Sequence, residues 1–115
     1  MTSQCLFCRI VSGEVPCDKV YEDELILAFK DIHPEAPTHI LVIPKQHAAN
    51  ILELSQNDDK LIISIFKTMS HLAHENGIDL NGFRIVTNTG PDGGQTVDHV
   101  HFHLLGGRNM TWPPG

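Results

Sequence analysis

The sequence predicts an α+β fold in which five short antiparallel strands form one sheet that packs against one long helix. Apolar, β-branched segments bounded by turn residues lie on both sides of a single long amphipathic segment. The last two of these segments are close enough in sequence to be antiparallel neighbours. With 115 residues, 41% hydrophobic and 19% charged, we expect one domain over residues 1–115 with a packed core.

The N-terminal part predicts a short helix followed by three strands. The stretch LFCRIVSG predicts a helix that ends at Gly13. Residues 17–31 predict two short strands with a tight turn near Asp23. THILVIP, residues 38–44, is the clearest strand because it is β-branched and apolar and has a proline on either side of its apolar run.

One long helix is expected to follow. It should begin after Ser55, with Asp58 three residues on as a variant of the capping pair, and end at Asn76 and Gly77. Apolar residues then recur at helical spacing: Leu61, Ile62, Ile65, Phe66, Met69, Leu72 and Ala73.

Two further strands complete the predicted sheet. They are FRIVTN, residues 83–88, and VDHVHFHLL, residues 97–105, and the glycine-rich stretch TGPDGGQT joins them. The order is therefore short helix, three strands, long helix, two strands. This order favours a meander of five strands covered by one helix.

Charge and composition exclude several classes of function. The formal net charge is -6 and the eight Lys and Arg residues are scattered, which argues against a nucleic-acid partner. No stretch approaches the roughly 20 apolar residues of a membrane span, and the first residues resemble no secretion signal. We expect a cytoplasmic protein without a membrane partner, in which Cys5, Cys8 and Cys17 are reduced.

The predicted last strand carries histidine at three alternate positions. Because strand side chains alternate between faces, His99, His101 and His103 should share one face. Val100 and Phe102 should share the other face with the leucine that follows. Neighbouring positions on one face lie about 6.5–7 Å apart, a distance that a phosphate with its substituents can span.

Three interpretations of the histidine face remain open: a solvated sheet face, a metal site and nucleophilic catalysis. A solvated face normally carries Lys, Glu and Thr rather than three imidazoles. Imidazole suits the other two, because its ordinary pKa near 6.5 leaves it partly neutral at cellular pH. Attack of histidine on phosphorus would form a covalent intermediate, with a second histidine assisting proton transfer.

The loop before this strand favours a phosphate site. Its glycines allow backbone N–H groups to approach phosphate oxygens, and Gly94, Gln95 and Thr96 stand immediately upstream of the histidines. Donors placed there could stabilise charge that develops in the transition state. By itself such a stretch would indicate only a hairpin loop. Beside three histidines it indicates a phosphate pocket.

These motifs together resemble the histidine-triad (HIT) superfamily. HVHFHLL fits the pattern His-φ-His-φ-His-φ-φ, where φ is hydrophobic, and FKDIHPEAPTHILVIPKQH resembles the segment before the helix of these proteins. The stretch NTGPDGGQTVDHVHFHLLGGRNMTWPPG resembles the C-terminal half of the HINT branch. The resemblance runs from about Cys5 to the last glycine. It implies a HIT-like fold whose sheet extends across a homodimer.

The resemblance implies a purine nucleotide-binding hydrolase that acts at the α-phosphate through a nucleotidyl-histidine intermediate, without a catalytic metal. The favoured substrates are nucleoside 5′-phosphoramidates such as AMP-NH2 or AMP-lysine. His103 favours hydrolysis, since uridylyltransferases of the superfamily carry glutamine at that position. The alternatives are a dinucleoside polyphosphate hydrolase, a nucleotide-binding or protein-interaction module with little turnover, and a purely metal-binding protein.

The resemblance also implies individual roles. His101 would be the nucleophile, His103 would lie at the phosphate and leaving group, and His39 would lie near both. The other implied contacts are Asn88, Gln95 and Thr96 to the phosphate, Asp31 to the ribose, Phe7, Ile10, Phe29 and Ile32 to the base, and Trp112 for substrate selectivity at the partner subunit's site. Without the resemblance the four apolar residues would be assigned to the core, Asp31 to a turn and Trp112 to a surface anchor.

Cys5 and Cys8 form a Cys-x-x-Cys pair, which can supply two of the four ligands of a tetrahedral zinc. The resemblance implies that His47 and His99 complete a structural zinc site. A redox-active pair is the competing interpretation, but the βαβ context of a thioredoxin-like motif is missing.

Overall fold

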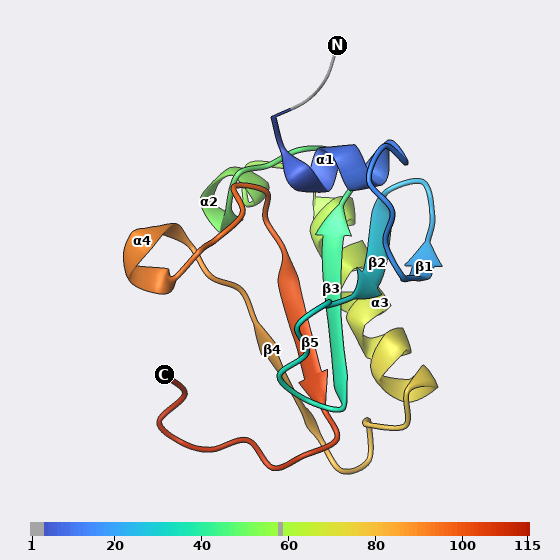
Figure 1. The fold of residues 1–115 in the computed structure, drawn as a ribbon, viewed down its shortest axis with the longest axis vertical. Coiled ribbons are helices and arrows are strands. Elements are labelled where there is room, and N and C mark those ends of the chain that lie inside the picture. The colour runs from blue at the N-terminus through green and yellow to red at the C-terminus, as the bar shows by residue number, and fades with distance from the viewer. Residues whose placement is uncertain (1–3, 58) are drawn as a thin grey trace.

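A computed structural model describes residues 4–57 and 59–115. Figure 1 shows one twisted sheet with the long helix α3 behind it and the short helix α1 across the end of β3. The elements, in chain order, are α1 (Leu6–Val11), β1 (Lys19–Glu22), β2 (Ile26–Lys30), β3 (Thr38–Pro44), α2 (Ile51–Leu54), α3 (Asp59–Glu75), β4 (Phe83–Val86), α4 (Gly90–Gly93) and β5 (Phe102–Gly106).

The five strands form a single sheet with the order β1-β2-β3-β5-β4, and every neighbouring pair is antiparallel. β3 and β5 lie at the centre, and Leu41 of β3 is paired with His103 of β5. The histidine segment therefore leads into an inner strand, where hydrogen bonds on both sides hold its backbone.

Both faces of β2 and β3 are buried, as alternation along the strands requires. On one face, Ile40 and Val42 join the larger core beneath α3. On the other face, Leu41 and Ile43 form a smaller core with Phe7 of α1. His99 and His101 lie on the side of the smaller core, where Phe7 of α1 contacts both rings.

Most of the predicted elements are confirmed. The strand at Thr38–Pro44 has the predicted bounds, and the short first helix and the two strands before residue 31 are present. The Asp23 Oδ1 accepts hydrogen bonds from the N–H groups of Leu25 and Ile26, each at 2.8 Å, which closes the expected turn. Gly77, with φ +69°, follows the long helix as predicted.

The start of the long helix differs from the prediction. A separate short helix, α2, occupies residues Ile51–Leu54, and α3 begins at Asp59 rather than directly after Ser55. The missed signal was Asn50, whose side chain accepts from the N–H groups of Leu52 and Glu53 and starts α2. The expected capping role of Asp58 lies outside the described residues.

The predicted strand over residues 97–105 was too long. The chain bends at 97–99, and β5 covers only Phe102–Gly106. The Val100 N–H instead donates to the Ala48 carbonyl at 2.7 Å, so the backbone at this point pairs with a loop and joins the sheet only at β5. The glycine-rich connection also contains a turn of helix, α4. It was not predicted, because glycine and proline have low helix propensity.

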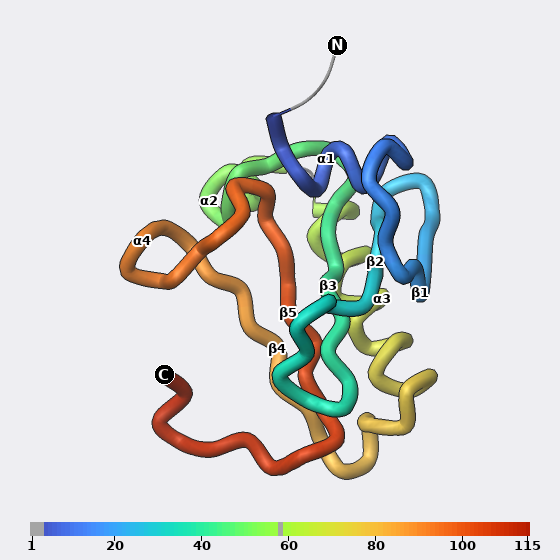
Figure 2. Tube along the Cα trace, viewed as in Figure 1, coloured from blue at the N-terminus to red at the C-terminus, as the bar shows by residue number. Residues whose placement is uncertain are grey.

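The rest of the chain is arranged at the edges. Figure 2 shows that the C-terminal tail runs away from the end of β5 and leaves the sheet.

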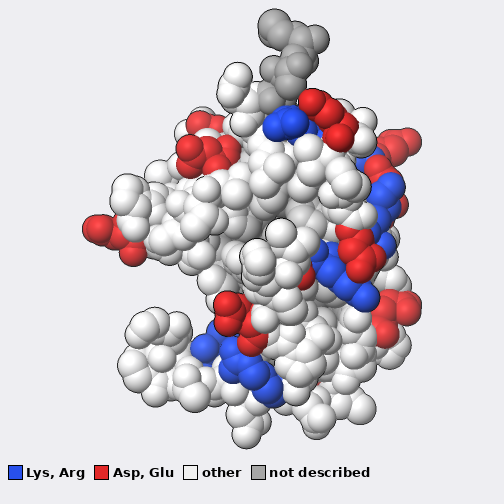
Figure 3. Space-filling view, viewed as in Figure 1, with Lys and Arg blue, Asp and Glu red and all other residues white. Residues whose placement is uncertain are grey.

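On the face in Figure 3, basic and acidic side chains are interspersed, without a continuous basic stripe. Among the described residues, no helix is both long and apolar enough to cross a membrane.

Gly106, in β5, gives a test of the packing between the sheet and the loop after α3. A Cβ at this position would lie 2.6–2.9 Å from three side-chain atoms of Ile78. We expect Gly106→Ala to lower the free energy of unfolding by about 1–3 kcal/mol through overpacking, measured by urea denaturation. The loss should shrink in an Ile78→Ala background. Equal losses in both backgrounds would show that this contact is not the cause.

Candidate functional site

Two cysteines and two histidines meet between α1, the segment after β3 and the bend before β5. Cys5 and Cys8 come from α1 and its N-cap, while His47 and His99 come from the other two segments. Their four ligand atoms all lie within 4.8 Å of one another. The structure thus brings together the four residues that the resemblance implied as zinc ligands.

The separations within this group fit a tetrahedral zinc site. The Nδ1 atoms of His47 and His99 are 3.2 Å apart, and three sulfur–nitrogen pairs lie at 3.3, 3.4 and 3.5 Å. Bond lengths of about 2.0–2.1 Å to nitrogen and 2.3 Å to sulfur at a tetrahedral angle require separations of about 3.3 and 3.6 Å. Four protein ligands leave no open position, so the site is structural.

The backbone selects the nitrogen that His99 presents to this group. His99 Nε2 lies 2.8 Å from the Pro44 carbonyl oxygen, which can only accept, so Nε2 carries the proton. Nδ1 is then a bare lone pair directed at the cysteine sulfurs. A hydrogen bond to the unligated nitrogen is typical of a metal-binding histidine.

The same reasoning assigns the proton on His101. Its Nδ1 lies 2.8 Å from the His99 carbonyl oxygen, so Nδ1–H donates, and in the neutral ring Nε2 is the nitrogen with the lone pair. Among the described residues, Arg9 Nε is the one buried side-chain nitrogen or oxygen without a hydrogen-bond partner. The Nε2 atom of His101, which also has no partner, is therefore solvent-accessible although the residue is only 5% exposed.

A chain of hydrogen bonds fixes His39 and His103. The Glu35 N–H donates to His39 Nδ1 at 3.0 Å, so the proton of His39 resides on Nε2. This Nε2–H donates to His103 Nδ1 at 2.9 Å and lies 3.4 Å from Asp31 Oδ2. His103 must then carry its own proton on Nε2, beside the His101 ring at a centroid distance of 5.1 Å.

Proton positions also distinguish this second cluster from the zinc site. Asp31, His39 and His103 place a carboxylate and two imidazole nitrogens within 4.8 Å, a ligand set that many metals accept. However, the nitrogen of His39 that faces the cluster is protonated, because the other one accepts from Glu35. The geometry therefore supports hydrogen bonding among these groups rather than a second metal site.

Burial keeps His103 neutral. Desolvation, followed by the nearby His101 and His39, lowers the pKa of His103 to about 4, and Asp31 offsets only part of this. At neutral pH its Nε2–H is therefore a hydrogen-bond donor on an uncharged ring. Desolvation likewise lowers the pKa of His99, which suits a ligand that binds metal in the neutral form.

An apolar cleft of about 220 Å³ opens beside the histidines. All five residues implied at the ribose and base line it: Phe7, Ile10, Phe29, Asp31 and Ile32. Phe7 and Phe29 form its buried floor with an edge-on ring contact at 5.6 Å, whereas Ile32 is 86% exposed at the rim. Core packing alone therefore does not describe these four apolar residues, because they also line a cleft.

Comparison with known proteins assigns the family. A family profile described as "HIT domain" matches residues 12–110. The chain belongs to the HIT family.

Individual HIT relatives agree over nearly the whole chain. A HIT family hydrolase from Legionella pneumophila Philadelphia 1 is 51% identical, and its crystal structure has a TM-score of 0.94 over 97% of this chain and 100% of that one. The 14 kDa zinc-binding protein of Zea mays is 43% identical over 98% of this chain and 89% of its own length. The histidine triad nucleotide-binding protein of Candida albicans is 34% identical, with a TM-score of 0.81 over 96% and 83% of the two chains.

In this HIT protein Gln95 supports the glycine-rich loop rather than presenting free donors. Its Nε2 donates to the carbonyls of Ala49 at 2.6 Å and Val97 at 2.9 Å, and its Oε1 accepts from the Gly90 N–H at 3.1 Å. Both amide hydrogens are thereby occupied. Gln95 therefore holds the start of α4 against the segment after β3.

The other predicted phosphate residues surround α4. Asn88 precedes it and Gly94, with φ +78°, ends it. Thr96 is exposed and lines an open cleft of about 710 Å³ beside the zinc group. None of these three forms a hydrogen bond with a histidine ring, so their phosphate roles stay predictions.

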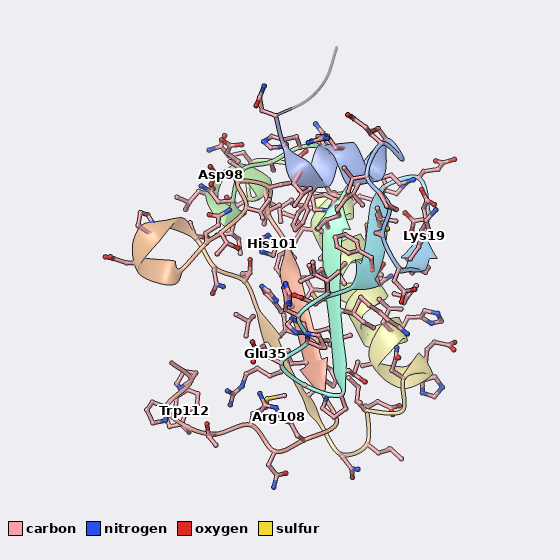
Figure 4. The ribbon with its side chains drawn as sticks, in the orientation of Figure 1. Lys19, Glu35, Asp98, His101, Arg108 and Trp112 are labelled. Atoms are coloured by element: carbon pink, nitrogen blue, oxygen red, sulfur yellow. The ribbon has the colours of Figure 1, made fainter. Side chains whose placement is uncertain are left out.

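Two further residues lie outside these clusters. Trp112 is 81% exposed and lies on the tail, away from His101 in Figure 4, so its expected role at the partner subunit's site stays a prediction. Thr87 was not predicted, yet its hydroxyl donates to the His101 carbonyl at 2.9 Å. Its position next to the end of β4 was the only available signal.

The protonation of His103 gives a direct test of this geometry. In an NMR titration, we expect the His103 ring to gain its proton near pH 4 rather than 6.5. Since the unfolded chain binds this proton more tightly, the residue's contribution to stability should be complete above pH 6.5 and decline as the pH falls towards 4. Exposed His74, whose pKa Asp79 raises, is the internal control. Titration of His103 at or above 6.5 would contradict the assigned hydrogen bonds.

Proposed function

We propose that this protein is a nucleotide hydrolase that cleaves purine nucleoside 5′-phosphoramidates through a nucleotidyl-His101 intermediate. The observation that carries the proposal is the proton assignment on His101. Its Nδ1–H is committed to the His99 carbonyl, while its bare Nε2 is accessible. A neutral imidazole with one accessible lone pair is the form that attacks phosphorus. The hydrolase and nucleotide-binding relatives support the same reaction class.

In the first step Nε2 of His101 bonds to the α-phosphorus as the phosphorus–nitrogen bond breaks, and the departing nitrogen takes up a proton from solvent and leaves as the free amine. His103 is placed to donate a hydrogen bond from Nε2–H to the leaving group, since His39 already satisfies its Nδ1. Water then attacks the phosphorus as the bond to Nε2 of His101 breaks, and the proton that the water gives up balances the one taken by the amine. The nucleoside monophosphate is released and His101 is restored. Splitting the reaction in this way replaces one high barrier with two lower ones.

The cleft beside the histidines suits a purine nucleoside. Its floor of Phe7 and Phe29 offers ring edges and faces to a planar base. Asp31 lies between this floor and His39, where its carboxylate could accept hydrogen bonds from ribose hydroxyls. With base and ribose bound in this way, the phosphate would lie over the histidine rings. It favours AMP or GMP derivatives over a nucleic-acid strand.

Further parts of the proposal concern assembly and location. A cytoplasmic homodimer would bring the tail of one subunit towards the other's cleft, which would give exposed Trp112 a role in selecting the leaving group. Within the dimer the phosphate would meet Asn88, Gly94 and Thr96 around α4. Zinc is assigned no chemical step, because its four ligands come from the protein.

Two other functions remain as competitors. A dinucleoside polyphosphate hydrolase would use the same nucleophile but a longer leaving group. A binding module would keep the cleft and act by occupancy alone. The accessible Nε2 of His101 favours an enzyme, since occupancy needs no nucleophile.

Substitution of the nucleophile tests the proposal. His101→Asn should lower kcat on AMP-lysine to the uncatalysed rate, a loss of at least about 10³-fold, while zinc content is unchanged. Mass spectrometry of the acid-sensitive intermediate should detect nucleotidylated wild-type protein but not the variant. Wild-type turnover no faster than that of His101→Asn would favour the binding module.

A further inference from the structure

We propose that the zinc site positions the nucleophile and the aromatic floor of the cleft, so that loss of zinc lowers activity without unfolding the sheet. His99 and Phe7 are the positioning residues. The inference rests on the proposed function for its activity readout, but its geometric part concerns this chain alone. The metal takes no part in the reaction.

The first connection passes through a single residue, His99. Its ring is a zinc ligand through Nδ1 and is anchored at Nε2 by the Pro44 carbonyl. Its backbone carbonyl is the group that accepts Nδ1–H of His101 at 2.8 Å. A shift of His99 therefore moves the acceptor that sets both the orientation and the tautomer of His101.

The backbone around His99 has no sheet to hold it. The chain bends at residues 97–99, and β5 starts only at Phe102. After His99, the Val100 N–H donates to the Ala48 carbonyl and the Thr87 hydroxyl donates to the His101 carbonyl; before it, the Val97 carbonyl accepts from Gln95 Nε2. Zinc coordination would fix the position of His99 in this bend, where no strand hydrogen bonds hold the backbone.

The second connection passes through α1. Cys5 and Cys8 flank Phe7, whose ring contacts His99 at 5.8 Å and His101 at 5.1 Å, both edge-on. α1 has six residues, fewer than a helix needs to be stable alone. Coordination of both sulfurs thus fixes Phe7 against the nucleophile and within the floor of the cleft.

The metal ligand most suitable for perturbation is His47. It is exposed and lies on the loop after β3, and its substitution removes no atom that bonds to His101, so any change at His101 would arise through the metal and His99. It also lines the open cleft of about 710 Å³ together with Cys5 and Cys8. Chelators and competing thiols can therefore reach the site, and zinc availability would set the active fraction of the protein.

The test compares His47→Gln with His71→Gln, a matched substitution of an exposed histidine on α3. Four quantities are measured for each full-length protein: bound zinc, the amide NMR spectrum of the sheet, AMP affinity, and the ¹⁵N shifts of the His101 ring. Cys8→Ser is the second zinc-site variant, in case His47→Gln retains the metal.

The zinc-free variant should keep the sheet spectrum but lose the fixed Nδ1–H tautomer of His101. AMP should bind several-fold more weakly, and kcat should fall by about 10²-fold, the effect of a small misplacement of a reacting group. His71→Gln should match the wild type in all four measurements. Added zinc should restore a chelator-stripped wild-type protein.

Two results would overturn the inference. One is a zinc-free variant with an unchanged His101 tautomer and AMP affinity. The other is loss of the whole sheet spectrum in both zinc-site variants, because zinc would then support the entire fold rather than the nucleophile. Absence of turnover in the zinc-loaded wild type would reject the proposed function alone, since the tautomer and AMP affinity still report the coupling.

Discussion

The hydrogen bond from His101 Nδ1–H to the His99 carbonyl is the interaction on which the site depends. It places one proton, and by doing so leaves a lone pair on the accessible Nε2. The Pro44 carbonyl likewise accepts from His99 Nε2–H, and the Glu35 N–H donates to His39 Nδ1, so the backbone also selects the tautomers of these two rings. The tautomers that distinguish metal ligand, nucleophile and donor are therefore set by the fold.

The sheet makes this arrangement possible because its inner strands use both faces. Beneath α3, the larger core contains Val100, Phe102 and Leu104, which alternate with the histidines. On the other side, α1 supplies both the cysteines and Phe7. One short helix thus closes the smaller core, and its Phe7 contacts the rings of His99 and His101. The ring of His103 lies further along the same face. Burial there lowers the pKa of His103 to about 4 and keeps that ring uncharged.

The sequence predicted the order of the main elements because periodicity and turn residues report burial directly. It also predicted which side the histidines share, since alternation continues through residues 99–105 although the strand begins only at Phe102. It could not predict where the strand begins, because the acceptor for the Val100 N–H lies on a distant loop. The same holds for Gln95, whose amide could equally have faced a phosphate or, as found, neighbouring carbonyls.

A crystal structure with AMP bound tests the central claim most directly. We expect the base to lie on the floor formed by Phe7 and Phe29, and the phosphorus to lie within about 3–3.5 Å of His101 Nε2, the separation of a reactive complex. The His101 Nδ1–H should still donate to the His99 carbonyl. A phosphate bound elsewhere, or a His101 ring turned so that Nε2 faces the backbone, would contradict it.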